Sequence, residues 1–100
     1  MLTLTQLSRI IDNLGYPECG YPVSRSNSYV FALSNDIHDT EFGMVRAWLY
    51  RDGTTVKCID IGTCRMTDTS SVITHIDSRD TDNIADTDEV KRFIRIVDIA

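Results

Sequence analysis

The first apolar pattern along the chain has the spacing of a helix. Its stripe consists of Leu4, Leu7, Ile11 and Leu14. Residues three and four positions apart share one helix face, so this stripe predicts an amphipathic helix. Thr3 and Gln6 have the spacing of a capping box at its start, and Gly15 is a typical stop at its end. We therefore expect a helix from about Leu4 to Leu14.

The pattern then changes from irregular to alternating. Gly15 to Asn27 is rich in glycine, proline and serine, which predicts a loop. Ser28 to Ser34 alternates, with Tyr29, Phe31 and Leu33 on one face, and a period of two is typical of a strand. The polar stretch that follows predicts a connection.

The middle of the chain predicts a hairpin. Met44 to Arg51 and Thr54 to Ile61 are strand-like runs joined by Asp52-Gly53, the dipeptide that a type I′ turn prefers. Such a turn fixes the pairing of the two strands. The expected pairs are Arg51 with Thr54, Leu49 with Val56 and Ala47 with Cys58.

This pairing assigns the hairpin side chains to two faces, because neighbours in a strand point to opposite sides. One face is apolar and predicts the core: Val45, Ala47, Leu49, Val56 and Cys58. The other face is mixed: Met44, Arg46, Trp48, Tyr50, Thr55, Lys57, Ile59 and Ile61.

The remaining elements follow from weaker signals. Gly62 indicates a bulge or a strand end, and Thr63 to Thr67 with Ser71 to Ile76 predicts a further hairpin. Asp86 to Glu89 resembles a second capping box. An amphipathic helix is expected to continue from Val90 to Val97.

Together these elements predict an α+β fold with two layers. A meander of four to five antiparallel strands would have the N-terminal and C-terminal helices packed on one face. The length and the absence of repeats or linkers predict a single domain over residues 1–100.

The composition limits the cellular compartment and the kinds of binding partner that we expect. The chain has no apolar run long enough to cross a bilayer and no signal-peptide pattern, which excludes a membrane protein and predicts a cytoplasmic one. Cys19, Cys58 and Cys64 are few and widely spaced, so we expect reduced thiols. The basic residues form no cluster, which disfavours direct binding of nucleic acid.

The net charge of -5 comes from one short segment. This segment runs from Asp77 to Glu89 and has a single basic residue, Arg79. Its six acids are Asp77, Asp80, Asp82, Asp86, Asp88 and Glu89. A solvated loop is one interpretation, and a partner with a basic surface or a nucleic-acid groove is the other. Calcium binding is not expected, because counting an EF-hand loop from Asp80 puts Ile84 and Lys91 at ligand positions.

Arg46, Trp48 and Tyr50 form a second candidate site on the mixed face of the hairpin. These three residue types are enriched in binding hot spots. Two interpretations stay open, a binding surface for another protein or an apolar layer covered by the chain itself or by a dimer partner.

No catalytic, metal or cofactor site is expected. His38 and His75 have no recognisable nucleophile nearby in the sequence, and the cysteines lack the C-x-x-C spacing of a zinc site.

The leading hypothesis is a non-enzymatic protein-binding module. We expect a small acidic inhibitor or adaptor of the anti-defence type that phages and mobile elements encode, directed at a nucleic-acid-handling complex such as a CRISPR or restriction enzyme. The alternative is a chaperone-like or structural homodimer that uses the Trp48 and Tyr50 face.

Overall fold

The computed structural model describes residues 1–15, 20–23, 27–33, 41–66, 71–84 and 86–98. Helix α1 spans Leu4–Asn13, as the apolar stripe predicts. Its capping box is complete, since the Gln6 amide donates to Thr3 Oγ1 at 3.2 Å and the Thr3 amide donates to Gln6 Oε1 at 2.9 Å. After it, Gly15 adopts a positive φ of 88°, which a residue without Cβ adopts at low cost.

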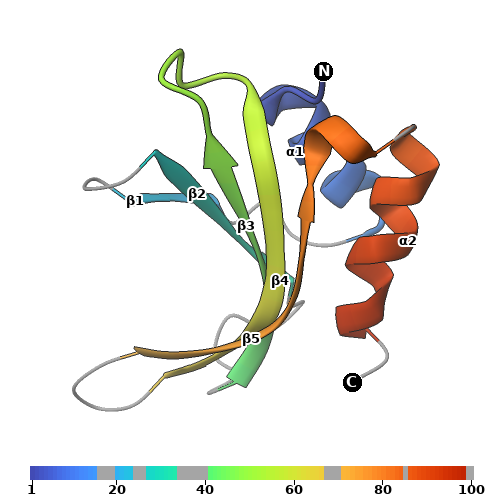
Figure 1. The fold of residues 1–100 in the computed structure, drawn as a ribbon. Coiled ribbons are helices and arrows are strands. Elements are labelled where there is room, and N and C mark those ends of the chain that lie inside the picture. The colour runs from blue at the N-terminus through green and yellow to red at the C-terminus, as the bar shows by residue number, and fades with distance from the viewer. Residues whose placement is uncertain (16–19, 24–26, 34–40, 67–70, 85, 99–100) are drawn as a thin grey trace.

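Five antiparallel strands form one sheet in sequence order, β1-β2-β3-β4-β5 (Figure 1). Their bounds are β1 Gly20–Val23, β2 Ser28–Leu33, β3 Glu41–Leu49, β4 Val56–Met66 and β5 Ser71–Asp80. A short 3-10 helix, η1, spans Thr81–Asn83, and α2 spans Thr87–Asp98. The predicted α+β meander with a helix at each end is confirmed.

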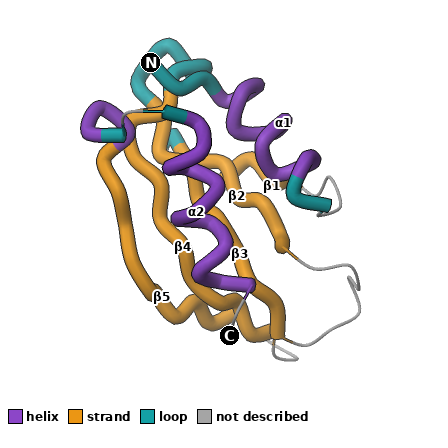
Figure 2. The backbone as a smooth tube through the Cα atoms, turned by 90° about the vertical axis from the view of Figure 1, so that its right-hand side faces the viewer, coloured by secondary structure: helices purple, strands orange, loops and turns teal. Residues whose placement is uncertain are grey.

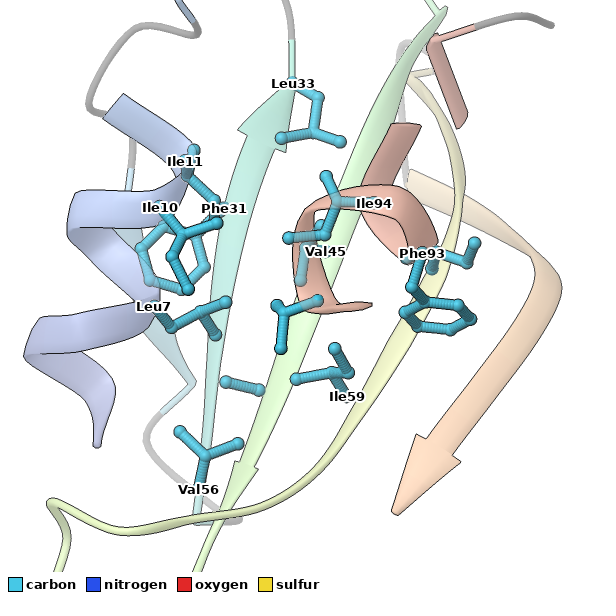
Figure 3. Close-up of a cluster of buried hydrophobic side chains, with 13 residues drawn as sticks. Leu7, Ile10, Ile11, Phe31, Leu33, Val45, Val56, Ile59, Phe93 and Ile94 are labelled. Carbon is cyan, nitrogen blue, oxygen red and sulfur yellow. The ribbon is translucent and has the colours of Figure 1, made fainter. Parts of the chain in front are cut away.

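Both helices lie on one face of the sheet (Figure 2). The core contains Leu7, Ile10 and Ile11 of α1, Val90, Phe93 and Ile94 of α2, and Phe31, Leu33, Val45, Ala47, Val56, Ile59 and Ile61 of the strands. Figure 3 shows side chains of both helices directed at those of the sheet. Burying one aliphatic side chain of this size stabilises a fold by roughly 1.5–3 kcal/mol.

Strand β1 lies in the segment predicted to be a loop, and that part of the prediction is wrong. Gly20 pairs with Phe31 and Val23 pairs with Ser28. Glycine and proline argue against a strand that has neighbours on both sides. Because β1 is an edge strand, Pro22 is tolerated there without an N–H to donate.

The central hairpin forms, but its register changes within β4. Leu49 faces Val56 as predicted, whereas Trp48 faces Cys58 and Ala47 faces Ile59. Lys57 is therefore an extra residue, a β-bulge. The predicted pair of Ala47 with Cys58 and the core position of Cys58 are wrong, because a shift of one residue moves every later side chain to the opposite face.

The bulge changes the composition of the core. Ile59 and Ile61 were expected on the mixed face, yet they are 0% and 1% exposed in the core. Cys58 lies instead beside Trp48 on the opposite face, where it is half-buried. The core thus contains Ile59 and Ile61 in place of the thiol of Cys58.

The turn of this hairpin is not type I′. A type I′ turn needs positive φ at both central residues, and here Gly53 has φ 76° while no described non-glycine residue has positive φ. Tyr50 N–H donates to the Thr55 carbonyl at 2.9 Å, so Arg51 and Thr54 lie within the turn instead of forming the expected pair.

The Asp52 carboxylate holds the turn. Its Oδ1 accepts from the amides of Thr54 and Thr55, and its Oδ2 accepts from the Thr55 hydroxyl at 2.7 Å. Hydrogen bonds that favour the charged form lower the pKa of Asp52 to about 2, the largest contribution coming from the Thr55 hydroxyl.

The second hairpin is confirmed, with Met66 facing Ser71. Gly62 does not end the strand, and β4 continues through it. The register changes beside it, because Ile61 faces Asp77 while Gly62 faces His75, leaving Ile76 as the extra residue of β5. A Cβ at Gly62 would collide with the carbonyl oxygen of Thr74, so glycine permits this close approach.

Helix α2 begins beside Asp86, as the second capping pattern predicts. The Glu89 amide donates to Asp86 Oδ1 at 2.9 Å, and Asp88 and Glu89 lie in the first turn, where the helix dipole favours negative charge. Within the described part of the chain, no helix combines the length and the apolarity that a membrane span requires.

Candidate functional site

The sheet face opposite α1 and α2, called the helix-free face, contains the predicted aromatic residues. Its described part is buried at Met44, which is 2% exposed, and becomes more open toward Trp48 and Tyr50. Tyr50 follows the end of β3 and is 38% exposed. The face is thus covered by the chain itself at one end and accessible at the other.

Trp48 is held in place by two polar neighbours. Its indole Nε1 donates to Asp60 Oδ2 on β4 at 2.5 Å. The Arg46 guanidinium lies 5.3 Å from the centre of the Trp48 ring, within the range of a cation–π contact. Arg46 Nε is buried without a hydrogen-bond partner among the described residues. The indole therefore has a fixed orientation and an electron-rich face that already attracts a cation.

Tyr50 connects this face to the acidic segment. Its hydroxyl donates to Asp82 Oδ2 at 3.0 Å, although the two residues are far apart in sequence. That hydrogen bond, followed by desolvation and the charges of Asp82 and Asp80, raises the pKa of Tyr50. At neutral pH Tyr50 is therefore a phenol that donates to a carboxylate.

A groove of about 830 Å³, called here the aromatic groove, opens beside these residues. It is lined by Asn27, Trp48, Leu49, Tyr50, Arg51, Asp52, Lys57 and Cys58. Arg51 and Lys57 lie at the hairpin end. On the β5 side, Asp80 faces Cys58 across the sheet. The groove thus joins an aromatic wall to charged margins of both signs.

The acids of the predicted segment divide between two places. Asp77 faces the core residue Ile61, and its carboxylate lies 3.6 Å from Arg79. The others form what we call the acidic ridge: Asp80, Asp82, Asp86, Asp88 and Glu89, running from the end of β5 to the first turn of α2. Lys91 forms an ion pair with the ridge, its Nζ lying 4.0 Å from Asp88 Oδ1.

Asp82 lies between the aromatic groove and a second hollow. It contacts Tyr50 beside the aromatic groove, and it also lines a hollow of about 300 Å³ with Met1, Ile84 and Asp86. The structure thus brings together Trp48, Tyr50, Asp80 and Asp82, which the sequence placed in two separate candidate sites. It leaves Asp77 on the helix side of β5.

Sequence reasoning missed Asp60 and Thr81. The Thr81 hydroxyl is buried, 2.5 Å from the Val56 carbonyl and 3.0 Å from the Lys57 carbonyl, so it satisfies main-chain groups at the β4 bulge. The sequence did contain an indication for Asp60, because a charged residue between Ile59 and Ile61 in a strand needs a polar partner. Nothing local indicated Thr81.

The described thiols have properties unlike those of reactive cysteines. Cys58 and Cys64 are free, and desolvation is the main cause that raises the pKa of each thiol. No described group of three or more His, Cys, Asp or Glu side chains is arranged to hold a metal ion. His38 and Cys19 lie outside the described residues.

The chain was compared with protein-family models, with curated proteins and with solved structures, and none of them matches it.

Proposed function

We propose that this protein is a non-enzymatic binding module that holds a basic segment of another protein. An apolar or aromatic side chain of that segment enters the aromatic groove, while its Lys or Arg side chains lie along the acidic ridge. The observation that carries the proposal is the hydrogen bond from Tyr50 to Asp82, which makes the groove and the ridge one continuous surface.

Charge supports a basic partner. The ridge has five acids, and between Asp80 and Glu89 the sequence has no basic residue. The Arg46 contact with Trp48 supports the same chemistry, because it is an example within this chain of a guanidinium on that ring. Arg51 and Lys57 at the hairpin end would repel a basic segment. The segment is therefore expected to run from the groove toward α2.

The shape of the ridge favours a protein segment over a groove built for duplex nucleic acid. Its acids follow a strand end, a 3-10 helix and a helix start, so they form no straight row. Glu41 begins β3 and so lies at the opposite end of that strand from Trp48 and Tyr50. An anti-defence inhibitor of a nucleic-acid enzyme is the more specific version of this proposal.

A binding titration tests the proposal directly, because Trp48 is the single tryptophan of the chain and reports on the groove. The probe is a peptide of alternating arginine and leucine, and its counterpart has glutamate in place of arginine. We expect a saturable change in Trp48 fluorescence with the basic peptide alone, weakened by salt.

Two sets of variants make the titration specific. Neutralising any two of Asp80, Asp82, Asp86 and Asp88 to Asn is expected to weaken binding severalfold and neutralising all four at least tenfold, whereas changing Asp12 and Glu41, also two acids, to neutral amides should leave it within twofold. Equal responses to both peptides, or equal losses in both sets, would show that the ridge does not select the partner.

A further inference from the structure

Among the described strands, β5 forms an edge of the sheet that is unpaired on its outer side. It pairs with β4 on one side, and no other described strand pairs with its outer side. In Figure 2 it is the outermost strand, and neither helix lies beyond it. Val72, Ile73 and Ile76 are 51%, 45% and 41% exposed, which makes them three of the five large hydrophobic residues described as exposed.

The first half of β5 lacks the charged residues and the proline that usually protect an edge. Natural edge strands are protected from pairing with another chain by charged residues such as lysine, by proline or by a β-bulge, and in β5 the bulge comes only at Ile76. The stretch from Ser71 to Ile76 contains no proline and no Asp, Glu, Lys or Arg, and these charged residues begin at Asp77. Its β-branched side chains favour strand pairing.

The main chain of this stretch is oriented for such pairing. The Thr74 carbonyl oxygen points toward β4, because it is the atom nearest to a Cβ placed on Gly62. Main-chain groups of successive residues in a strand point to alternate sides. The main-chain N–H and C=O groups of Ile73 therefore point outward, away from β4.

The other edge of the sheet does not offer the same opportunity. Strand β1 has only four residues, and Pro22 among them has no N–H to donate. If β5 paired with β1 of the next molecule, each added molecule would again present a free β5 edge, and the assembly would not close. Pairing of β5 with β5 is isologous and closes as a dimer.

We propose that two copies of this chain associate through antiparallel pairing of β5 with β5, centred on Thr74. In that register Ile73 faces His75 of the second copy, and Val72 lies opposite the bulge residue Ile76, where the regular pairing ends. No like charges oppose each other, and the threonines pair at the symmetry axis, as favoured across antiparallel strands.

The composition of the strand favours this register over one centred on Ile76. Centring the pair on Ile76 would place Val72 opposite Asp80 and Ile73 opposite Arg79, so that apolar side chains face charged ones. This dimer uses a different surface from the aromatic groove, and it stands or falls independently of the proposed function.

Sedimentation equilibrium from micromolar to millimolar concentration tests the dimer. The wild-type chain is expected to reach twice its 11.3 kDa mass. Ile73→Lys places a charge next to the axis and should weaken dimerisation at least tenfold. Ser78→Lys is the matched control, since Ser78 is exposed on the same strand and the same sheet face but outside the paired segment, and it should still dimerise.

The outcomes distinguish the β5 interface from the aromatic groove and from self-association through the helix-free face. A far-UV circular dichroism spectrum and a melting curve show whether Ile73→Lys is folded, and folded Ile73→Lys should keep the Trp48 response to the basic peptide. A wild-type chain that stays monomeric at millimolar concentration would overturn the dimer. A dimer lost on Trp48→Ala but kept in Ile73→Lys would also overturn it and assign self-association to the helix-free face.

Discussion

Trp48 on β3 donates its indole N–H to the Asp60 carboxylate on β4 at 2.5 Å, in a partly buried position. The two residues are not direct cross-strand partners, because Trp48 faces Cys58 and Asp60 faces Arg46. The contact is thus diagonal, between positions two residues apart on one face. It orients the indole that forms one wall of the aromatic groove.

Removing the acceptor of this bond should destabilise the protein. We expect Asp60→Ala to lower the free energy of unfolding by about 1–3 kcal/mol, because the indole N–H loses a charged partner. Asp60→Asn keeps a neutral acceptor and should cost less. Urea denaturation followed by Trp48 fluorescence measures both, with exposed Asp12→Ala as the control within about 0.5 kcal/mol. Equal stability of all three variants would contradict a structural role for the bond.

The bulge at Lys57 makes opposite predictions for two adjacent residues. Ile59 is 0% exposed, so Ile59→Ala should cost about 2–5 kcal/mol. Cys58 is half-buried on the other face, and Cys58→Ala should cost about 1 kcal/mol or less. Without the bulge the order would reverse, since Cys58 would face the core. Chemical denaturation of the two variants decides between these registers.

The Thr81 hydroxyl should contribute to the stability of that bulge. Thr81→Val keeps the shape of the side chain but leaves the Val56 and Lys57 carbonyls without this donor. We expect a loss of about 1–3 kcal/mol in the free energy of unfolding. Thr87→Val, an exposed threonine at the start of α2, is the comparison. A loss no greater than that of Thr87→Val would mean that the bulge does not depend on Thr81.

The contact between Tyr50 and Asp82 predicts a pH dependence. Because the hydrogen bond to Asp82 raises the pKa of Tyr50, the folded state retains the phenol proton above the usual value of 10.0. The stabilisation is therefore fully present below pH 10 and is lost as the pH rises through the folded-state pKa. Phenolate absorbance, taken as the difference between wild type and Tyr50→Phe, measures the titration.

Asp82→Asn should move this titration back toward 10.0, since it removes the acceptor charge. Glu41→Gln, at the far end of β3, should leave it unchanged. A Tyr50 titration that does not respond to Asp82→Asn would contradict the contact that joins the aromatic groove to the acidic ridge.

Local patterns were sufficient for much of the secondary structure. The apolar stripe and capping box of α1, the alternation of β2 and the Asp86 cap of α2 each depend on residues within one turn or one strand. Such short-range preferences act before the chain folds and can be seen in the sequence. They also determined the order of elements, and with it the α+β meander.

The register of the sheet was decided by tertiary packing. Both Cys58 and Ile59 fit a strand, and only burial against α1 and α2 favours Ile59 in the core, with Thr81 satisfying the carbonyls at the bulge. Strand β1 likewise depends on its pairing with β2, because its own composition disfavours a strand.

The same distinction holds for the candidate site. The sequence by itself determined which residues carry the aromatic and acidic chemistry, because side-chain types and their local clustering do not require a fold. Only the tertiary structure decided that Tyr50 meets Asp82 and that Asp77 turns toward Arg79 instead. The physical reason is that pairing of β4 with β5 brings together residues far apart in sequence, and no local preference specifies which ones meet.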